Sequence, residues 1–154
     1  MNKAYLITVG RIKTAFWRDA AEHYRLRLSK GWALKETVVK DADSALPVTE
    51  RQQQEGERIL AALPAGCAVI CLDEHGQSYS SVAFAGFLNT LWDKAMPPCF
   101  IIGGAYGLAE NVLQRAHKKI SFGPMTLPHE LACVVLWEQL FRADCILRKT
   151  GYHH

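Results

Sequence analysis

Three apolar segments of the chain end in residues that let a backbone approach a ligand closely. Leu72 leads into a turn around Gly76, residues 102–107 read IGGAYG, and residues 122–129 read FGPMTLPH. Glycine has no Cβ, so its backbone can lie nearer to a bound molecule than that of other residues. A tight strand-to-helix turn also favours glycine, so one such loop alone does not indicate a ligand site. Three loops after three strands predict a ligand site at the carboxyl edge of a sheet.

The spacing within these loops argues against the common nucleotide and metal motifs. Residues 103–107 lack the G-x-G-x-x-G of dinucleotide sites, and no G-K-[ST] of a phosphate-binding loop follows. His129 and Cys133 resemble part of the zinc motif H-E-x-x-H, but the spacing suggests no third ligand. We therefore expect no metal, an inert thiol at Cys133, and a capping or substrate-facing His129.

Further polar candidates lie near the C-terminus. Glu138 and Arg142 are four residues apart, on one side of an otherwise apolar helical segment. Such a pair is either a satisfied ion pair or part of a site at a contact between subunits. Tyr152 and His153 lie in the last five residues, where the ordinary interpretation is a frayed end.

The elements that must position these residues alternate between strand and helix, which indicates an α/β fold with a mainly parallel sheet in one domain, residues 1–154. Thr49 is the expected N-cap of the second helix, Pro128 the first residue of the last, and residues 74–79 a turn. Apolar runs predict strands at 4–10, 33–40, 67–73, 99–103 and 119–122, and helical spacing predicts helices at 14–29, 49–63, 80–94, 109–116 and 128–147.

The last predicted helix is apolar on two sides. Leu131, Val134 and Val135 lie on one side, and Leu136 and Leu140 lie on the other. A helix of this kind must be covered on both sides. The sheet can cover one side, and we expect a second copy of the chain to cover the other, which predicts a homodimer.

Composition and charge limit the class of protein. The chain has 154 residues, 49% of them hydrophobic and 21% charged, which excludes a disordered or fibrous chain. We find neither a membrane-spanning run nor a signal peptide, and we expect a cytoplasmic protein. Five cysteines without C-x-x-C spacing disfavour a disulfide framework.

Charge is distributed unevenly along the chain. Residues 1–40 carry nine basic and three acidic side chains, residues 41–110 three and nine, and residues 111–154 six and three. If the two basic ends meet, they form a surface suited to a phosphate backbone; ordinary solvated helix faces are the alternative. We expect reversal of Arg25 and Arg27 to weaken such binding and its salt dependence.

Several motifs in the same order resemble the RlmH (YbeA) family, the bacterial SPOUT-class methyltransferases of large-subunit ribosomal RNA. The resemblance covers essentially the whole chain, including its length. The motifs are residues 100–108 (FIIGGAYGL), residues 121–129 (SFGPMTLPH), residues 138–143 (EQLFRA) and the terminal Tyr152-His153.

The resemblance implies an α/β fold with a C-terminal trefoil knot and a homodimer that binds S-adenosylmethionine near the subunit contact. The reaction it implies is N3-methylation of a pseudouridine in helix 69 of 23S rRNA, in the assembled ribosome. Carried over to matching positions, the cofactor residues are Leu72, Gly103, Phe122, Gly123, Pro124, Met125, Thr126 and Leu127.

Catalysis by such an enzyme rests on positioning and on removal of the N3 proton. The sequence does not choose the base among its candidates. A SPOUT enzyme for another RNA such as tRNA, and a non-catalytic ribosome-binding factor, are the alternatives at this point. The catalytic candidates are His129, Glu138, Arg142, Tyr152 and His153.

Overall fold

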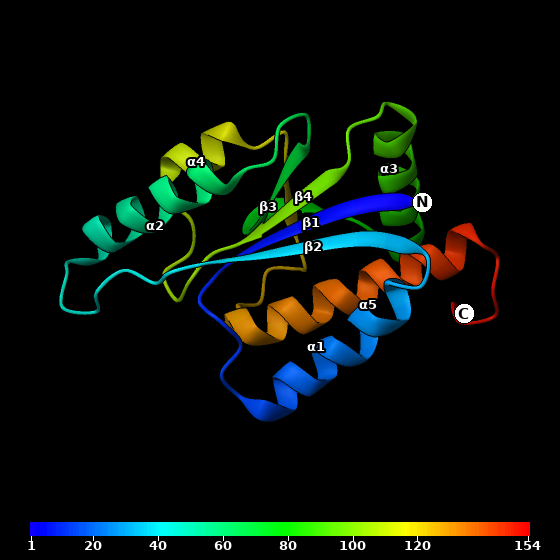
Figure 1. Cartoon of the computed structure of the whole chain (residues 1–154), viewed down its shortest axis with the longest axis horizontal. Helices are drawn as coiled ribbons and strands as arrows, with labels where there is room; N and C mark the ends of the chain where they lie inside the picture. Colours follow the sequence, from blue (N-terminus) through cyan, green and yellow to red (C-terminus); the bar gives the residue numbers. More distant parts are fainter.

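The computed structural model describes all 154 residues, which form a five-stranded parallel sheet between two layers of helices (Figure 1). The strand order is β2-β1-β4-β3-β5, and every neighbouring pair is parallel. The strands are β1 (Asn2–Val9), β2 (Trp32–Val39), β3 (Ala68–Ser78), β4 (Pro98–Ile102) and β5 (Lys118–Ser121). The helices are α1 (Ala15–Leu28), α2 (Val48–Ala62), α3 (Ser81–Asp93), α4 (Glu110–Arg115) and α5 (His129–Leu147). The predicted α/β class is confirmed.

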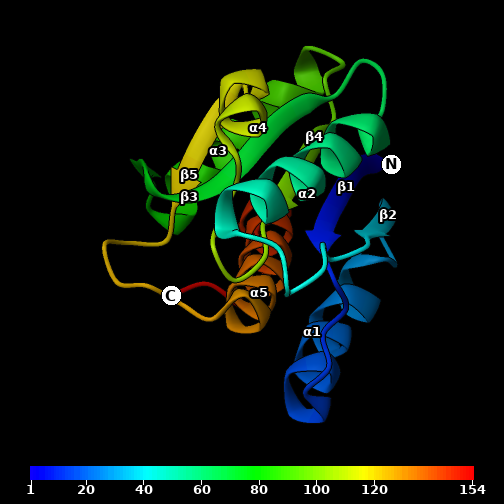
Figure 2. The ribbon, with the colours of Figure 1, turned by 90° about the vertical axis from the view of Figure 1, so that its left-hand side faces the viewer.

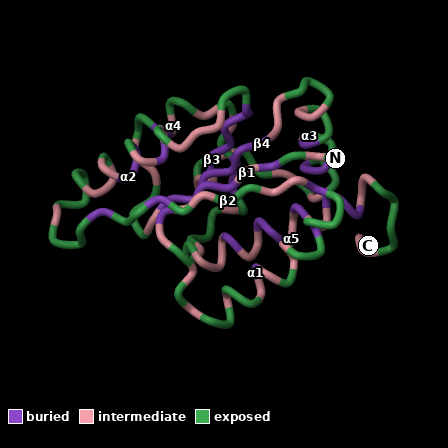
Figure 3. Tube along the Cα trace, in the orientation of Figure 1, coloured by how far each residue is buried: buried purple, intermediate pink, exposed green.

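Alternation along the strands divides the core into two layers. Leu6 and Phe100 face α1, α3 and α5, whereas Ile7 and Ile101 face α2 and α4, because successive side chains of a strand point to opposite faces. Figures 1 and 2 show α1 and α5 on one side of the sheet and α2 and α4 on the other. The central strands are the most deeply buried part of the trace (Figure 3). A parallel sheet covered on both faces explains the continuous apolar runs in the sequence.

Three local predictions need correction. Residues 74–78 continue β3 instead of forming a turn, because the Gly76 backbone packs against β5; a Cβ there would lie 2.6 Å from the Lys119 carbonyl carbon. Pairing resumes after an irregularity, with Gln77 opposite Ile120. Helix α2 begins at Val48, with Pro47 and not Thr49 at the N-cap. Pro128 is the N-cap of α5 and not its first helical residue, which is His129.

Helix α5 packs against the sheet, α1 and α3 through one side. Leu136, Leu140 and Ala143 are buried there, while Val134 and Val135 on the other side are half-buried. No helix combines the length and the hydropathy needed to span a membrane. The homodimer and the trefoil knot stay predictions at this stage.

Candidate cofactor cleft and C-terminal cluster

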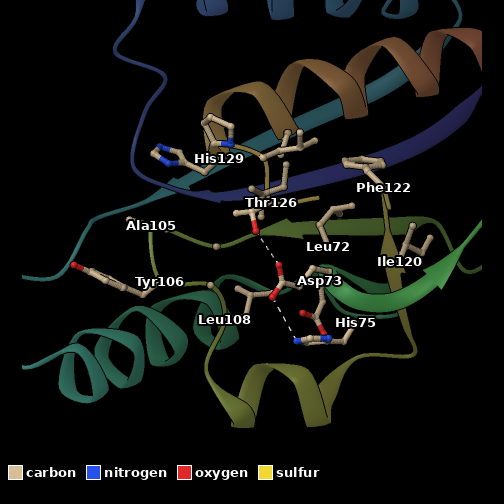
Figure 4. A pocket seen from close by; sticks show the side chains of 18 of the residues that line it. Leu72, Asp73, His75, Ala105, Tyr106, Leu108, Ile120, Phe122, Thr126 and His129 are labelled. Carbon is tan, nitrogen blue, oxygen red and sulfur yellow. Dashed lines mark hydrogen bonds and ion pairs between the residues drawn. The ribbon is translucent and has the colours of Figure 1, made fainter. Parts of the chain in front are cut away.

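A cleft of about 900 Å³ opens beyond the ends of β4 and β5 and beside the irregular middle of β3 (Figure 4). Its walls come from residues 72–75 of β3, residues 102–108 and the segment from Phe122 to Ala132, so two of the loops singled out in the sequence meet there with a strand segment in place of the third. The volume is within the range of small-molecule sites. Parallel strands place their carboxyl ends at one edge, which explains how segments 50 residues apart line one cavity.

The loop after β4 folds back on itself. Gly104 and Gly107 form an isolated antiparallel bridge, and Gly107 has a φ of +78°. A Cβ on Gly103 would lie 2.9 Å from the carbonyl carbon and oxygen of Gly107, which is closer than real Cβ contacts. Glycine at position 103 is therefore required by the backbone of its own loop. We name residues 103–107 the glycine loop.

The loop after β5 is anchored at both of its ends. The Ser121 hydroxyl accepts a hydrogen bond from the Gly123 amide at 3.0 Å and lies 2.8 Å from the Gly123 carbonyl. Gly123 has a φ of +118°, which favours glycine and turns the chain toward the cleft. Farther along, the Thr126 hydroxyl donates to a Glu74 carboxylate oxygen at 3.3 Å, so this loop is tied to the middle of β3 (Figure 4).

The cleft continues to the first turn of α5. His129 lines it, and the next side chain, Glu130, accepts hydrogen bonds from the backbone amide and hydroxyl of Thr14, both at 3.1 Å. The Thr14 amide, with its hydroxyl, holds the pKa of Glu130 below its usual value. The beginning of α1 is thereby attached beside the cleft.

Cys133, one turn beyond His129, is an inert core residue. Burial raises the pKa of its thiol to about 12, so the thiolate needed for nucleophilic attack or metal binding is disfavoured. No group of three or more His, Cys, Asp or Glu side chains is arranged to hold a metal ion.

A second polar group lies near the C-terminus, and we name Glu138, Arg142, Tyr152 and His153 the C-terminal cluster. Oε1 of Glu138 accepts hydrogen bonds from Nε of Arg142 and from the hydroxyl of Tyr152, both at 3.0 Å. Nη1 of Arg142 lies 3.2 Å from Nδ1 of His153. Guanidinium nitrogens only donate, so this Nδ1 accepts and the imidazole proton resides on Nε2. The last residues are therefore held by side chains of α5.

The environment of Tyr152 favours its neutral form. Burial, together with the hydrogen bond to Glu138, raises the pKa of the phenol to about 12. The Arg142 guanidinium lies 4.8 Å from the centre of the ring. The hydroxyl therefore stays a hydrogen-bond donor at physiological pH.

The C-terminal cluster does not line the cleft of its own chain. Arg142 follows His129 by thirteen residues (142 − 129), which is about 20 Å along a helix. The chain leaves α5 at the end far from the cleft, and its last residues turn back along this helix toward Glu138 (Figure 1). Within one chain the cleft therefore brings together seven of the eight predicted cofactor residues and His129. The other four catalytic candidates form the C-terminal cluster, away from the cleft.

The two arginines singled out on α1 have different surroundings. Arg25 binds the carboxylates of Glu22 and Glu36, the second at 3.3 Å, so its charge is compensated. Arg27 has no carboxylate within 4.0 Å, and its guanidinium lies 5.4 Å from the centre of the Phe141 ring. Phe141 in turn contacts Tyr152, so Arg27 is a cation beside the C-terminal cluster.

Comparison with known proteins places this architecture in a family. The family described as "Predicted SPOUT methyltransferase" matches residues 2–153. The chain belongs to this SPOUT methyltransferase family. Curated relatives named "Ribosomal RNA large subunit methyltransferase H" are 52% identical in Nitratidesulfovibrio vulgaris (strain DSM 19637 / Miyazaki F) and 50% identical in Oleidesulfovibrio alaskensis. Both alignments cover 100% of this chain and of the relative.

A solved structure supports the SPOUT methyltransferase fold alone. It is described as "Structural insights into the 2-OH methylation of C/U34 on tRNA" and has a TM-score of 0.50 and 18% sequence identity. The match covers 96% of this chain and 98% of that one.

S-adenosylmethionine is the cofactor of SPOUT methyltransferases, and the cleft fits it. Apolar side chains such as Leu72 and Ile120 can contact a planar adenine, while the glycine loop presents backbone groups to its polar edge. Of the predicted cofactor residues only Pro124 is not among those that line the cleft; the seven that line it are Leu72, Gly103, Phe122, Gly123, Met125, Thr126 and Leu127.

Two carboxylates that line the cleft were not predicted as site residues from the sequence. Asp73 and Glu74 follow Leu72 directly and line the same wall. Carboxylates can accept hydrogen bonds from ribose hydroxyls or from an ammonium group, both of which S-adenosylmethionine carries. Their position at the end of an apolar strand is the signal that could have identified them.

Proposed function

We propose that this SPOUT methyltransferase methylates N3 of a pseudouridine in helix 69 of 23S rRNA, in assembled cytoplasmic ribosomes. The support is the full-length identity of about half to relatives named for large-subunit ribosomal RNA. The observation that carries the proposal is the cleft itself, where the loops after β4 and β5 converge with residues 72–75 of β3. The pseudouridine and its N3 atom come from the resemblance of the motifs at residues 100–108 and 121–129.

The chain's own residues have two tasks in this reaction. The cofactor supplies an electrophilic methyl group, and the protein must hold the target nitrogen in line with it. N3 carries a weakly acidic proton, so a nearby base or a group that stabilises the adjacent oxygen accelerates transfer. His129 lies in the cleft and is one candidate. The C-terminal cluster supplies the others, including a carboxylate and a phenol held in its neutral form.

The separation between the cleft and the C-terminal cluster supports a homodimer. Within one chain the cluster lies along α5 away from the cleft, so a second copy must bring its cluster to the cofactor. Val135 on α5 is half-buried and lies outside both core clusters, and the surface around it is the one that a second copy would cover. We therefore infer that each site combines the cleft of one subunit with the C-terminal cluster of the other.

Methyl transfer to defined RNA substrates tests this function. Purified protein is incubated with tritiated S-adenosylmethionine and either ribosomes or stripped 23S rRNA, and the labelled nucleotide is mapped. We expect label at one pseudouridine of helix 69, with ribosomes preferred. Label on purified tRNA but not on ribosomes would select another RNA target. Failure to bind S-adenosylmethionine at millimolar concentration in calorimetry would favour a non-catalytic ribosome-binding factor.

A further inference from the structure

Tyr106 is an exposed aromatic residue at the rim of the cleft. It belongs to the glycine loop and is 54% exposed, so burial in the core does not explain its position. Its side chain extends away from the centre of the cavity and lies over α2 (Figure 4). The exposed part of the ring is therefore available to a molecule that approaches the outside of the cleft.

Helix α2 holds Tyr106 at two points. Nε2 of Gln52 donates a hydrogen bond to the Tyr106 carbonyl oxygen at 2.6 Å. The guanidinium carbon of Arg51 lies 4.9 Å from the centre of the ring, a cation–π contact. Nε of Arg51 is buried without a hydrogen-bond partner, and this guanidinium lies against the Tyr106 ring. The Tyr106 backbone and one face of its ring are thus held before any ligand arrives, which lowers the entropy cost of binding.

Helix α2 also supports the glycine loop, through Glu55. Glu55 is buried and accepts a hydrogen bond from the Ala42 amide at 3.0 Å. Its Oε1 would lie 3.2 Å from a Cβ placed on Gly104, so the carboxylate lies against the loop. The loop that carries Tyr106 is therefore braced on the side away from the cavity.

A fixed, exposed ring with an arginine against it is suited to a planar, unpaired nucleobase. Bases stack on aromatic side chains whatever their identity, and a neighbouring arginine adds attraction to the base and its phosphate. We propose that Tyr106 and Arg51 form a stacking platform for an unpaired base of the RNA substrate beside the target nucleotide. This proposal rests on the proposed function, because it takes the substrate to be RNA. The adenine of the cofactor is the competing occupant, and the outward direction of the ring favours the RNA.

Kinetic and binding measurements on the full-length protein test the platform. Tyr106→Leu removes the aromatic face, and Tyr106→Phe keeps it. We expect the leucine variant to raise the KM for ribosomes about tenfold and to weaken ribosome co-sedimentation equally, because stacking is lost. The phenylalanine variant keeps the wild-type KM, and both variants keep the wild-type calorimetric Kd for S-adenosylmethionine.

Arginine variants on α2 test the same platform with Tyr106 intact. We expect Arg51→Met to raise the ribosome KM about threefold through loss of the cation–π contact. Arg58→Met is the matched control, because Arg58 is on the same helix but donates to the Lys40 carbonyl oxygen. Its KM stays at the wild-type value.

Two results would overturn the platform. A higher Kd for S-adenosylmethionine with an unchanged ribosome KM in Tyr106→Leu would show that the ring holds the cofactor. Unchanged values in both Tyr106→Leu and Arg51→Met would show that the ring binds neither ligand. Co-sedimentation separates failure of the platform from failure of the proposed function. A wild-type protein that binds ribosomes without methylating them contradicts the proposed function. The platform is then tested by the ribosome binding of the same variants.

Discussion

The cofactor cleft and the C-terminal cluster are constructed in different ways. The cleft is made from two loops and a segment of β3 that only the sheet brings together, and the glycine loop in it depends on the absence of a Cβ at Gly103. The cluster is made by side chains within the last 17 residues (154 − 137): Arg142 and Tyr152 hydrogen-bond to the Glu138 carboxylate, and His153 contacts Arg142. We propose that the difference separates two tasks: shape at the cleft admits a cofactor, and polar groups in the cluster act on the substrate.

The largest expected effect comes from the backbone of the cleft. Gly103→Ala places a Cβ 2.9 Å from the Gly107 carbonyl group, so the glycine loop must shift. We expect the Kd for S-adenosylmethionine in calorimetry to rise about 100-fold, since overpacking costs about 1–3 kcal/mol. Gly86→Ala on α3 is the control, because its Cβ meets nothing within 4 Å. A wild-type Kd for Gly103→Ala would show that the loop tolerates the shift.

The cluster should give the opposite result, with catalysis lost and cofactor binding kept. Glu138→Ala removes the acceptor shared by Arg142 and Tyr152. We expect kcat for ribosome methylation to fall about 100-fold, the range of general acid–base catalysis, with the cofactor Kd unchanged. Arg148→Ala serves as the control and keeps full activity, because Arg148 is exposed and its buried partner Asp144 keeps the hydrogen bond from Nε1 of Trp32. Loss of cofactor affinity in Glu138→Ala would remove the distinction between the two regions.

Alkaline pH should affect the cluster selectively. The pKa of Tyr152 is about 12 in the folded chain and about 10 in an unfolded one. The unfolded chain therefore loses its phenolic proton first, and the stability contributed by Tyr152 is present below pH 10 and lost as the pH rises toward 12. We expect the difference in Tm between wild type and Tyr152→Phe to shrink over this window in thermal unfolding. A constant difference would mean that the hydroxyl titrates alike in both states.

The smallest expected effect distinguishes the two arginines of α1. Arg25 is compensated by two carboxylates, whereas Arg27 is a free cation beside the cluster. We expect Arg27→Gln to reduce the slope of log K for ribosome binding against log salt by about one, and Arg25→Gln to reduce it by less. Measurements at several salt concentrations check the order. Equal slopes for both variants would show that Arg27 is an ordinary solvated surface charge.

Local patterns in the sequence predicted most of the fold. Apolar runs identified all five strands, and the helix predicted from residue 80 begins at Ser81, with Ser80 as its N-cap accepting from the Ala83 amide at 3.1 Å. The continuation of β3 past residue 73 could not be predicted, because it depends on contact between Gly76 and a strand more than 40 residues later.

The candidate site was less predictable than the fold, because several of its contacts join residues that are far apart in the sequence. Glycine and strand ends pointed to the cleft, because both are local signals. The contact of Gln52 with the Tyr106 carbonyl joins residues 54 positions apart, and no periodicity reveals it. The distance between the cleft and the C-terminal cluster also required the three-dimensional arrangement, since the sequence places His129 and Glu138 on one helix.

Mixed dimers test the central claim, that one site needs the cleft of one chain and the cluster of another. Gly103→Ala and Glu138→Ala chains are co-expressed with different tags, and methyl transfer to ribosomes is measured. At subsaturating S-adenosylmethionine each variant alone keeps about a hundredth of wild-type activity, whereas random pairing leaves about a quarter of the sites with an intact cleft and an intact cluster from different chains. We predict about a quarter of wild-type activity in the mixture. A mixture as inactive as either variant alone would contradict the account.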